Sequence, residues 1–156
     1  MERKQPMELP GAASLRVFIV EDMPYIRTLL RGLLRRFGFE HVMEAGSVAE
    51  AVADMRRTPP DLIITDWEMP GHTGLDLLKW VRRNPASPNP ATPIILLTSH
   101  GDPETVRACR DAGANDFLVK PVAPKRLRES VAELLRKDRP FIVAPDYVGP
   151  DRRRVD

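Results

Sequence analysis

The sequence has little of what several classes of protein require. Its single cysteine, Cys109, excludes an intramolecular disulfide and a cysteine-rich metal site. No apolar run approaches the roughly 20 residues of a membrane span, and the first residues lack the apolar core of a signal peptide. The net charge of +2 provides no strong overall field for nucleic acid. We therefore expect a cytoplasmic protein that does not enter the membrane.

Short apolar runs alternate five times with stretches of helical periodicity. The chain has 156 residues, shows no internal repeat and lacks a glycine-rich phosphate loop. This alternation predicts an α/β fold, a doubly wound five-stranded parallel sheet of the flavodoxin-like order 2-1-3-4-5. The expected strands are 15–20, 41–45, 62–66, 94–97 and 116–119. The domain is expected to span residues 15–137, between a flexible arm at 1–14 and a tail at 138–156 that holds no output domain.

The chain is organised around the run from Leu62 to Asp66. Three large apolar residues and a threonine lead into Asp66, and the turn signal Pro70-Gly71 follows shortly after. A short apolar run between such signals is typical of a buried parallel strand. Asp66 then lies at the carboxyl end of a central strand, where open α/β sheets bind ligands. Taken alone, the residue could equally cap a loop.

Other strand ends carry polar residues that the same sheet edge brings together, namely Glu21-Asp22, Thr98 and Lys120. Three carboxylates in one pocket repel one another unless a cation lies among them. Oxygen ligands favour Mg²⁺, with Mn²⁺ as an alternative. Asp66 would be the nucleophile toward a phosphoryl group, with the metal and Lys120 neutralising charge and Thr98 donating a hydrogen bond.

These motifs resemble the receiver domain of two-component response regulators, in particular the stand-alone chemotaxis type. The resemblance covers the chain from Leu15 to about Lys137. It rests on four stretches in the same order as in the family: Ile19-Val20-Glu21-Asp22, Asp66-Trp67-Glu68-Met69-Pro70-Gly71, Leu97-Thr98-Ser99 and Phe117-Leu118-Val119-Lys120-Pro121.

The resemblance implies a role for each matching acid. Asp66 would accept a phosphoryl group from a histidine kinase or phosphotransfer protein. Asp22 and Asp66 would bind Mg²⁺ directly, together with the main-chain carbonyl of Glu68, and Glu21 would act through a water molecule. The protein would then not be an enzyme beyond its own phosphorylation and dephosphorylation. It would signal to a downstream target protein through contacts that depend on phosphorylation, with dimerisation as one such contact.

The resemblance also implies a switch. Thr98 and Phe117 would form the switch pair, Lys120 would contact the phosphoryl group, and the Lys120-Pro121 bond would be cis. Phe117 departs from the tyrosine of the chemotaxis protein, so its ring carries no hydroxyl group.

Three further residues near the motifs are candidates for modulating roles. Glu68 and His100 occupy the two positions that border the phosphoryl group in the family, where they would tune dephosphorylation, or else simply face solvent. Trp67 is interpreted as a shield over the pocket or as a contact residue. His41 and His72 lack the spacing of a metal site and are interpreted as surface residues.

Two other functions compete with this interpretation. An aspartyl-phosphate hydrolase of the haloacid dehalogenase kind requires Asp-x-Asp after the strand, but the triplet here is Asp66-Trp67-Glu68. A pseudo-receiver that only binds partners would lack the nucleophile, the lysine or an acid. In the tail, the apolar segment Phe141-Ile142-Val143 is expected to lie extended against the domain or a partner, with addition to a sheet edge as one arrangement. A solvated tail is the alternative.

Overall fold

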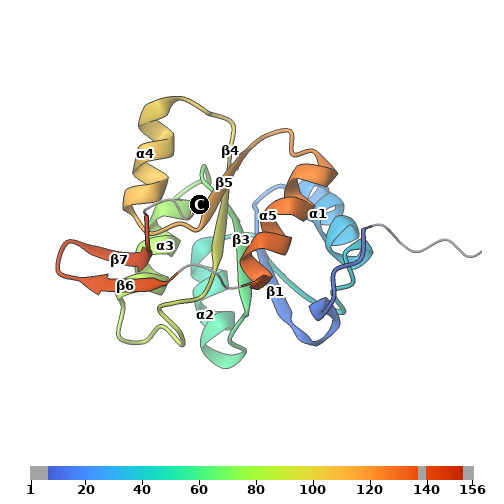
Figure 1. Cartoon of the computed structure of the whole chain (residues 1–156), viewed down its shortest axis with the longest axis horizontal. Coiled ribbons are helices and arrows are strands. Elements are labelled where there is room, and N and C mark those ends of the chain that lie inside the picture. Colours follow the sequence, from blue (N-terminus) through green and yellow to red (C-terminus); the bar gives the residue numbers. More distant parts are fainter. Residues whose placement is uncertain (1–6, 137–139, 153–156) are drawn as a thin grey trace, which may run out of the picture.

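The computed structural model describes residues 7–136 and 140–152. Five parallel strands form one sheet in the order β2-β1-β3-β4-β5, which confirms the predicted topology (Figure 1). The strands are β1 (Arg16–Val20), β2 (His41–Ala45), β3 (Leu62–Asp66), β4 (Ile94–Thr98) and β5 (Asp116–Val119). The helices are α1 (Pro24–Arg36), α2 (Val48–Arg57), α3 (Gly74–Arg83), α4 (Pro103–Asp111) and α5 (Pro124–Arg136).

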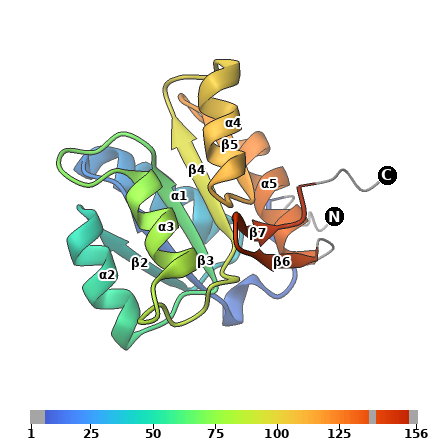
Figure 2. The same cartoon turned by 90° about the vertical axis from the view of Figure 1, so that its left-hand side faces the viewer.

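The two faces of the sheet are covered by different helices, as β1 illustrates. Successive side chains of a strand point to opposite faces. Val17 and Ile19 belong to a core that includes residues of α1 and α5, whereas Phe18 and Val20 belong to a core shared with α2, α3 and α4. All four side chains are fully buried. Helices α1 and α5 therefore lie on one face and the other three helices on the opposite face (Figure 2).

Capping side chains define where the helices near the strand ends begin. The Asp102 carboxylate accepts a hydrogen bond from the Thr105 N–H at 3.1 Å, and Pro103 occupies the first position of α4. The Ser47 hydroxyl accepts the Glu50 N–H at 3.2 Å at the start of α2. The connections after β2 and β4 are therefore short, since α2 begins at Val48 and α4 at Pro103.

Part of the segment expected to be a flexible arm is packed on the domain. Leu9 and Ala12 are buried, and the Leu9 N–H donates to the Phe37 carbonyl at 2.8 Å. Residues Ala12–Ser14 form a short 3₁₀ helix, and Arg128 of α5 donates to the Met7 carbonyl at 3.2 Å. The apolar side chains at positions 9 and 12 explain the difference, because burying them favours docking. Residues 1–6 of the expected arm lie outside the described residues.

The expected tail contains an antiparallel hairpin of β6 (Phe141–Ala144) and β7 (Tyr147–Pro150). The apolar segment is extended, as predicted, but it pairs with β7 rather than with an edge of the main sheet. Strand β7 is buried along its whole length, and the hairpin lies beside α3 in Figure 1. Residues 137–139 and 153–156 of the tail lie outside the described residues.

Arg82 of α3 contacts both the hairpin and the loops that precede β4 and β5. Its guanidinium group is almost fully buried and donates to the carbonyls of Gly113 (2.9 Å), Pro90 (2.8 Å) and Thr92 (2.7 Å) and to Asn115 Oδ1 (2.9 Å). Burial lowers the pKa of Arg82 to about 10, so it stays charged at neutral pH. Its guanidinium carbon also lies 5.4 Å from the ring centre of Phe141, so the arginine links the hairpin to the loops before β4 and β5.

Candidate functional site

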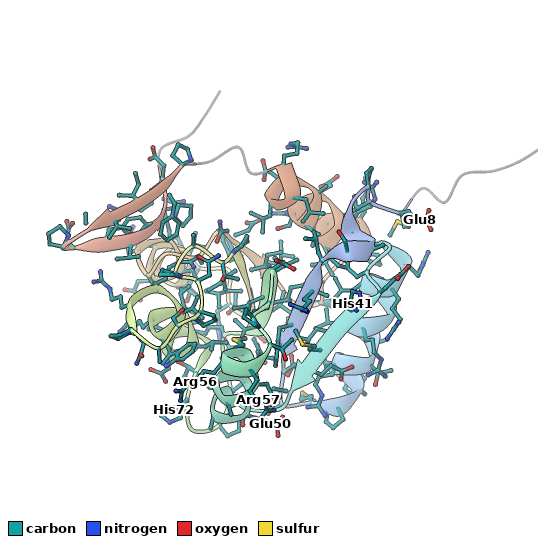
Figure 3. All side chains as sticks on the ribbon, turned by 90° about the horizontal axis from the view of Figure 1, so that it is seen from below. Glu8, His41, Glu50, Arg56, Arg57 and His72 are labelled. Carbon is teal, nitrogen blue, oxygen red and sulfur yellow. The ribbon has the colours of Figure 1, made fainter. Side chains whose placement is uncertain are left out.

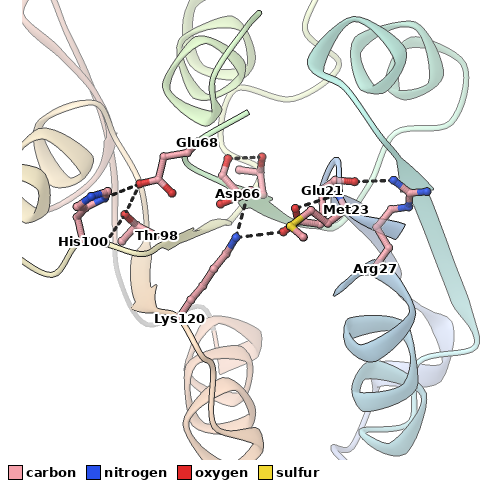
Figure 4. Close-up of polar contacts among 9 residues, drawn as sticks. Glu21, Met23, Arg27, Asp66, Glu68, Thr98, His100 and Lys120 are labelled. Carbon is pink, nitrogen blue, oxygen red and sulfur yellow. Dashed lines mark hydrogen bonds and ion pairs between the residues drawn. The ribbon is translucent and has the colours of Figure 1, made fainter. Parts of the chain in front are cut away.

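The carboxyl ends of β1, β3, β4 and β5 meet at one edge of the sheet and carry the polar residues that the sequence singled out. Glu21 follows β1, Asp66 ends β3, Thr98 ends β4 and Lys120 follows β5. Because the strands are parallel and paired in register, their ends lie side by side. Figure 4 shows these side chains converging from separate strands.

An acidic cluster forms the centre of the site. Carboxylate oxygens of Glu21, Asp22 and Asp66 all lie within 4.8 Å of one another. The Lys120 ammonium lies 2.9 Å from Asp66 Oδ2 and 3.3 Å from Glu21 Oε1 (Figure 4). Glu21 and Asp66 are both buried, so water screens this arrangement of three acids and one lysine only partly.

The pKa values of Glu21 and Lys120 are shifted because charged groups lie close together in a buried site. Burial, followed by the negative charge of Asp66, raises the pKa of Glu21 to about 7. Burial alone would lower the pKa of Lys120, but the hydrogen bond and charge of Asp66 and the charge of Glu21 outweigh it and raise that pKa. One lysine therefore does not compensate all the negative charge, and the cluster binds protons or cations readily.

One carboxylate oxygen in the cluster is left without a partner. Asp66 Oδ1 is buried and accepts no hydrogen bond from any of the described residues. A buried acceptor without a partner is costly, and a hard divalent cation would satisfy it. The all-oxygen donor set of Glu21, Asp22 and Asp66 fits such an ion, Mg²⁺ above all.

Thr98, Glu68 and His100 form a second group of contacts beside Asp66. The Thr98 hydroxyl donates to Glu68 Oε2 at 3.1 Å and accepts the His100 N–H at 3.0 Å, and His100 Nδ1 lies 2.8 Å from the same Glu68 oxygen. Partial burial raises the pKa of Glu68, but the hydrogen bonds from His100, Thr98 and the Ser99 N–H outweigh it and lower the pKa. The carboxylate is therefore ionised near neutral pH.

The remaining residues named from the sequence lie around this centre. Phe117 is half-buried on β5, where it pairs with Leu96 two residues before Thr98 and faces the same side of the sheet. It lines a hollow of about 430 Å³ among α4, β5, α5 and the hairpin. Trp67 is half-buried, and its main-chain N–H donates to the Leu97 carbonyl at 2.7 Å. The Lys120-Pro121 bond is cis.

Other residues are either remote from the site or were not anticipated. His41 and His72 are exposed and lie far apart (Figure 3).

Arg27 was interpreted only as part of a basic helix face, yet its side chain donates to the Glu21 carbonyl at 2.7 Å and pairs with Glu44 at 3.5 Å. Its position one turn into α1, directly after the acidic pair, was the one signal in the sequence that could have revealed this contact.

The doubly wound fold with an acidic pocket and a lysine at its carboxyl edge defines a class of phosphoacceptor proteins. A family model of the response regulator receiver domain matches residues 17–132, and the chain belongs to this family. Members of the family are phosphoacceptor switches of two-component signalling, and they bind Mg²⁺ through acidic residues. Their partners are histidine kinases or phosphotransfer proteins.

Individual relatives and solved structures agree with the family assignment. Sensory/regulatory protein RpfC of Xanthomonas campestris is 38% identical over 122 residues, which are 78% of this chain but 16% of RpfC. Chemotaxis protein CheY-3 of Vibrio cholerae is 29% identical over 124 residues, 80% of this chain and 94% of that protein. The structure of V. cholerae CheY4 superimposes with a TM-score of 0.66 and 32% identity over 79% of this chain and 97% of CheY4. Among the described residues, no helix is long and apolar enough to cross a membrane.

Proposed function

We propose that Asp66 accepts a phosphoryl group from a histidine kinase or phosphotransfer protein, and that the protein signals through contacts that depend on this phosphorylation. The observation that carries the proposal is the position of the Asp66 carboxylate. One of its oxygens lies 2.9 Å from the Lys120 ammonium and the other is buried without a partner among the described residues. An ionised carboxylate held in this way is a nucleophile toward phosphorus.

The reaction forms an oxygen–phosphorus bond at Asp66 and breaks the phosphorus–nitrogen bond of the donor phosphohistidine. Asp22, Asp66, the main-chain carbonyl of Glu68 and, through water, Glu21 would hold Mg²⁺. When bound, the ion neutralises negative charge on the phosphoryl oxygens. Lys120 would neutralise further charge, since its ammonium already contacts both Asp66 and Glu21.

The response to phosphorylation is assigned to Thr98 and Phe117. The Thr98 hydroxyl would turn toward a phosphoryl oxygen, and Phe117 would move into the space it leaves, because both residues face the same side of neighbouring strands. Such a movement would reshape the hollow that Phe117 lines, and through it the surface of α4, β5 and α5. Trp67 and His100 flank the site and would modulate the phosphorylated lifetime.

The experiment is phosphorylation by acetyl phosphate and Mg²⁺, followed by intact-mass measurement. Wild type should gain one phosphoryl group and Asp66→Asn none. Asp76→Asn serves as the matched control, because Asp76 is an exposed acid in the first turn of α3, and it should behave as wild type. Equal phosphorylation of Asp66→Asn and wild type would show that another residue is the acceptor.

A further inference from the structure

The only proton of the Thr98 hydroxyl is already donated in the unphosphorylated protein. The hydroxyl donates this proton to Glu68 Oε2 at 3.1 Å and accepts the His100 N–H at 3.0 Å. The Thr98 residue is completely buried. No hydrogen bond joins it to Asp66 among the described residues, although the two residues end neighbouring strands.

Glu68 is itself held in place, so it is a defined acceptor rather than a freely rotating side chain. The oxygen that accepts from Thr98 also contacts His100 Nδ1 at 2.8 Å. Figure 4 shows the Glu68 carboxylate beside Thr98 and His100, on the side of Asp66 away from Glu21. Thr98 at the end of β4 and His100 in the β4–α4 connection thus both contact one carboxylate from the β3–α3 connection.

We propose that the Glu68 side chain is a positioning residue that holds the Thr98 hydroxyl away from Asp66 until the phosphoryl group is present. A hydroxyl group has one proton to donate, so the bond to Glu68 must break before Thr98 can donate to a phosphoryl oxygen. The inference rests on the proposed function and adds to it a competition between two acceptors for one proton, Glu68 Oε2 and the phosphoryl group.

This competition has a thermodynamic consequence that can be measured. An interaction present only in the unphosphorylated conformation lowers the affinity for any group that requires the other conformation. Removing the Glu68 carboxylate should therefore tighten binding of a phosphoryl mimic, provided that Thr98 has a hydroxyl group to release. Charge repulsion between Glu68 and the mimic would also be relieved, but that effect does not depend on Thr98.

A double-mutant cycle separates these two effects. Wild type, Glu68→Ala, Thr98→Val and the double variant are titrated with beryllofluoride at saturating Mg²⁺, with Trp67 fluorescence as the signal. Mg²⁺ affinity is measured first for each protein, so that saturation is assured. We expect Glu68→Ala to tighten binding about three- to tenfold more when Thr98 is present than in the Thr98→Val background, as for one hydrogen bond to a charged group in a partly exposed site.

Two further variants test the specificity of the effect. Glu68→Gln removes the charge but keeps a side-chain oxygen that can accept from Thr98, so the part of the tightening that depends on the Thr98 hydroxyl should be smaller than in Glu68→Ala. Glu104→Ala removes an exposed acid in the first turn of α4 and should leave the affinity as in wild type. The Thr98 methyl resonance, recorded without Mg²⁺ or mimic, should shift in Glu68→Ala and stay close to wild type in Glu68→Gln.

The outcomes distinguish this inference from the proposed function. Equal effects of Glu68→Ala with and without the Thr98 hydroxyl, or an unmoved Thr98 methyl resonance, would overturn the inference while leaving Asp66 as the acceptor. Weaker binding in Glu68→Ala would also overturn it, because Glu68 would then support the phosphorylated conformation rather than oppose it. A wild-type protein that binds no beryllofluoride and gains no phosphate would overturn the proposed function, and the inference with it.

Discussion

Replacing Glu21 by glutamine should change how the stability of the protein depends on pH. Burial and the neighbouring charge of Asp66 raise the pKa of Glu21 from 4.5 to about 7. Between these two values the native state retains a proton that the unfolded state has released. The free energy of unfolding therefore falls as pH rises from about 4.5 to about 7, and is flat beyond that range as far as Glu21 is concerned.

The size of the effect follows from the shift. The difference of roughly 2.5 pKa units, at about 1.4 kcal/mol each, sets an upper limit of about 3 kcal/mol for the stability lost by pH 8. Glu21→Gln has no proton to lose, so its unfolding free energy should lack this decline. At pH 8 the variant should be more stable than wild type by up to about that amount, which already includes the ionic contact of Glu21 with Lys120 at 3.3 Å.

Urea denaturation followed by circular dichroism at pH 4.5, 6, 7 and 8, in EDTA, measures the slope. Glu129→Gln is the matched control, because Glu129 is exposed on α5, and its slope should equal that of wild type. Adding saturating Mg²⁺ should reduce the wild-type slope, since a cation among the carboxylates favours the ionised form. The same pH slope in Glu21→Gln and wild type would refute the reasoning.

Three further predictions concern stability and metal binding. Gly113→Ala should lower the unfolding free energy by about 3 kcal/mol in chemical denaturation, since φ is +101° and a Cβ would lie 2.3 Å from a carbonyl oxygen of β7. Gly71→Ala is the comparison: its φ is +80° but the space around it is open, so it should cost only about 1 kcal/mol. Arg82→Met should cost about 3 kcal/mol in the same measurement, because four acceptors, among them the buried carbonyls of Gly113 and Thr92, lose their donor; a loss below about 1 kcal/mol would contradict this. Asp22→Ala should weaken Mg²⁺ binding about tenfold or more in a Trp67 fluorescence titration, and an unchanged titration curve would remove Asp22 from the metal site.

The sequence by itself determined the order of the elements and the edge at which the site lies. Apolar runs such as Leu62–Thr65 and the helix caps at Ser47 and Asp102 are local signals, readable from neighbours along the chain. Because strands joined by crossover helices run parallel, their carboxyl ends share one edge of the sheet. That constraint alone brought Asp66 and Lys120 together, although 54 positions separate them in the sequence.

Tertiary structure alone decided the contacts that depend on distances between elements. The proton of Thr98 is shared with Glu68 rather than Asp66 because of how two loops approach each other, which no spacing encodes. The hairpin pairs with itself because its two strands pack against Gly113 and Arg82, groups whose position is set by the whole α3–β5 region. Such contacts are stabilised jointly by many distant residues, so periodicity and motif spacing do not specify them.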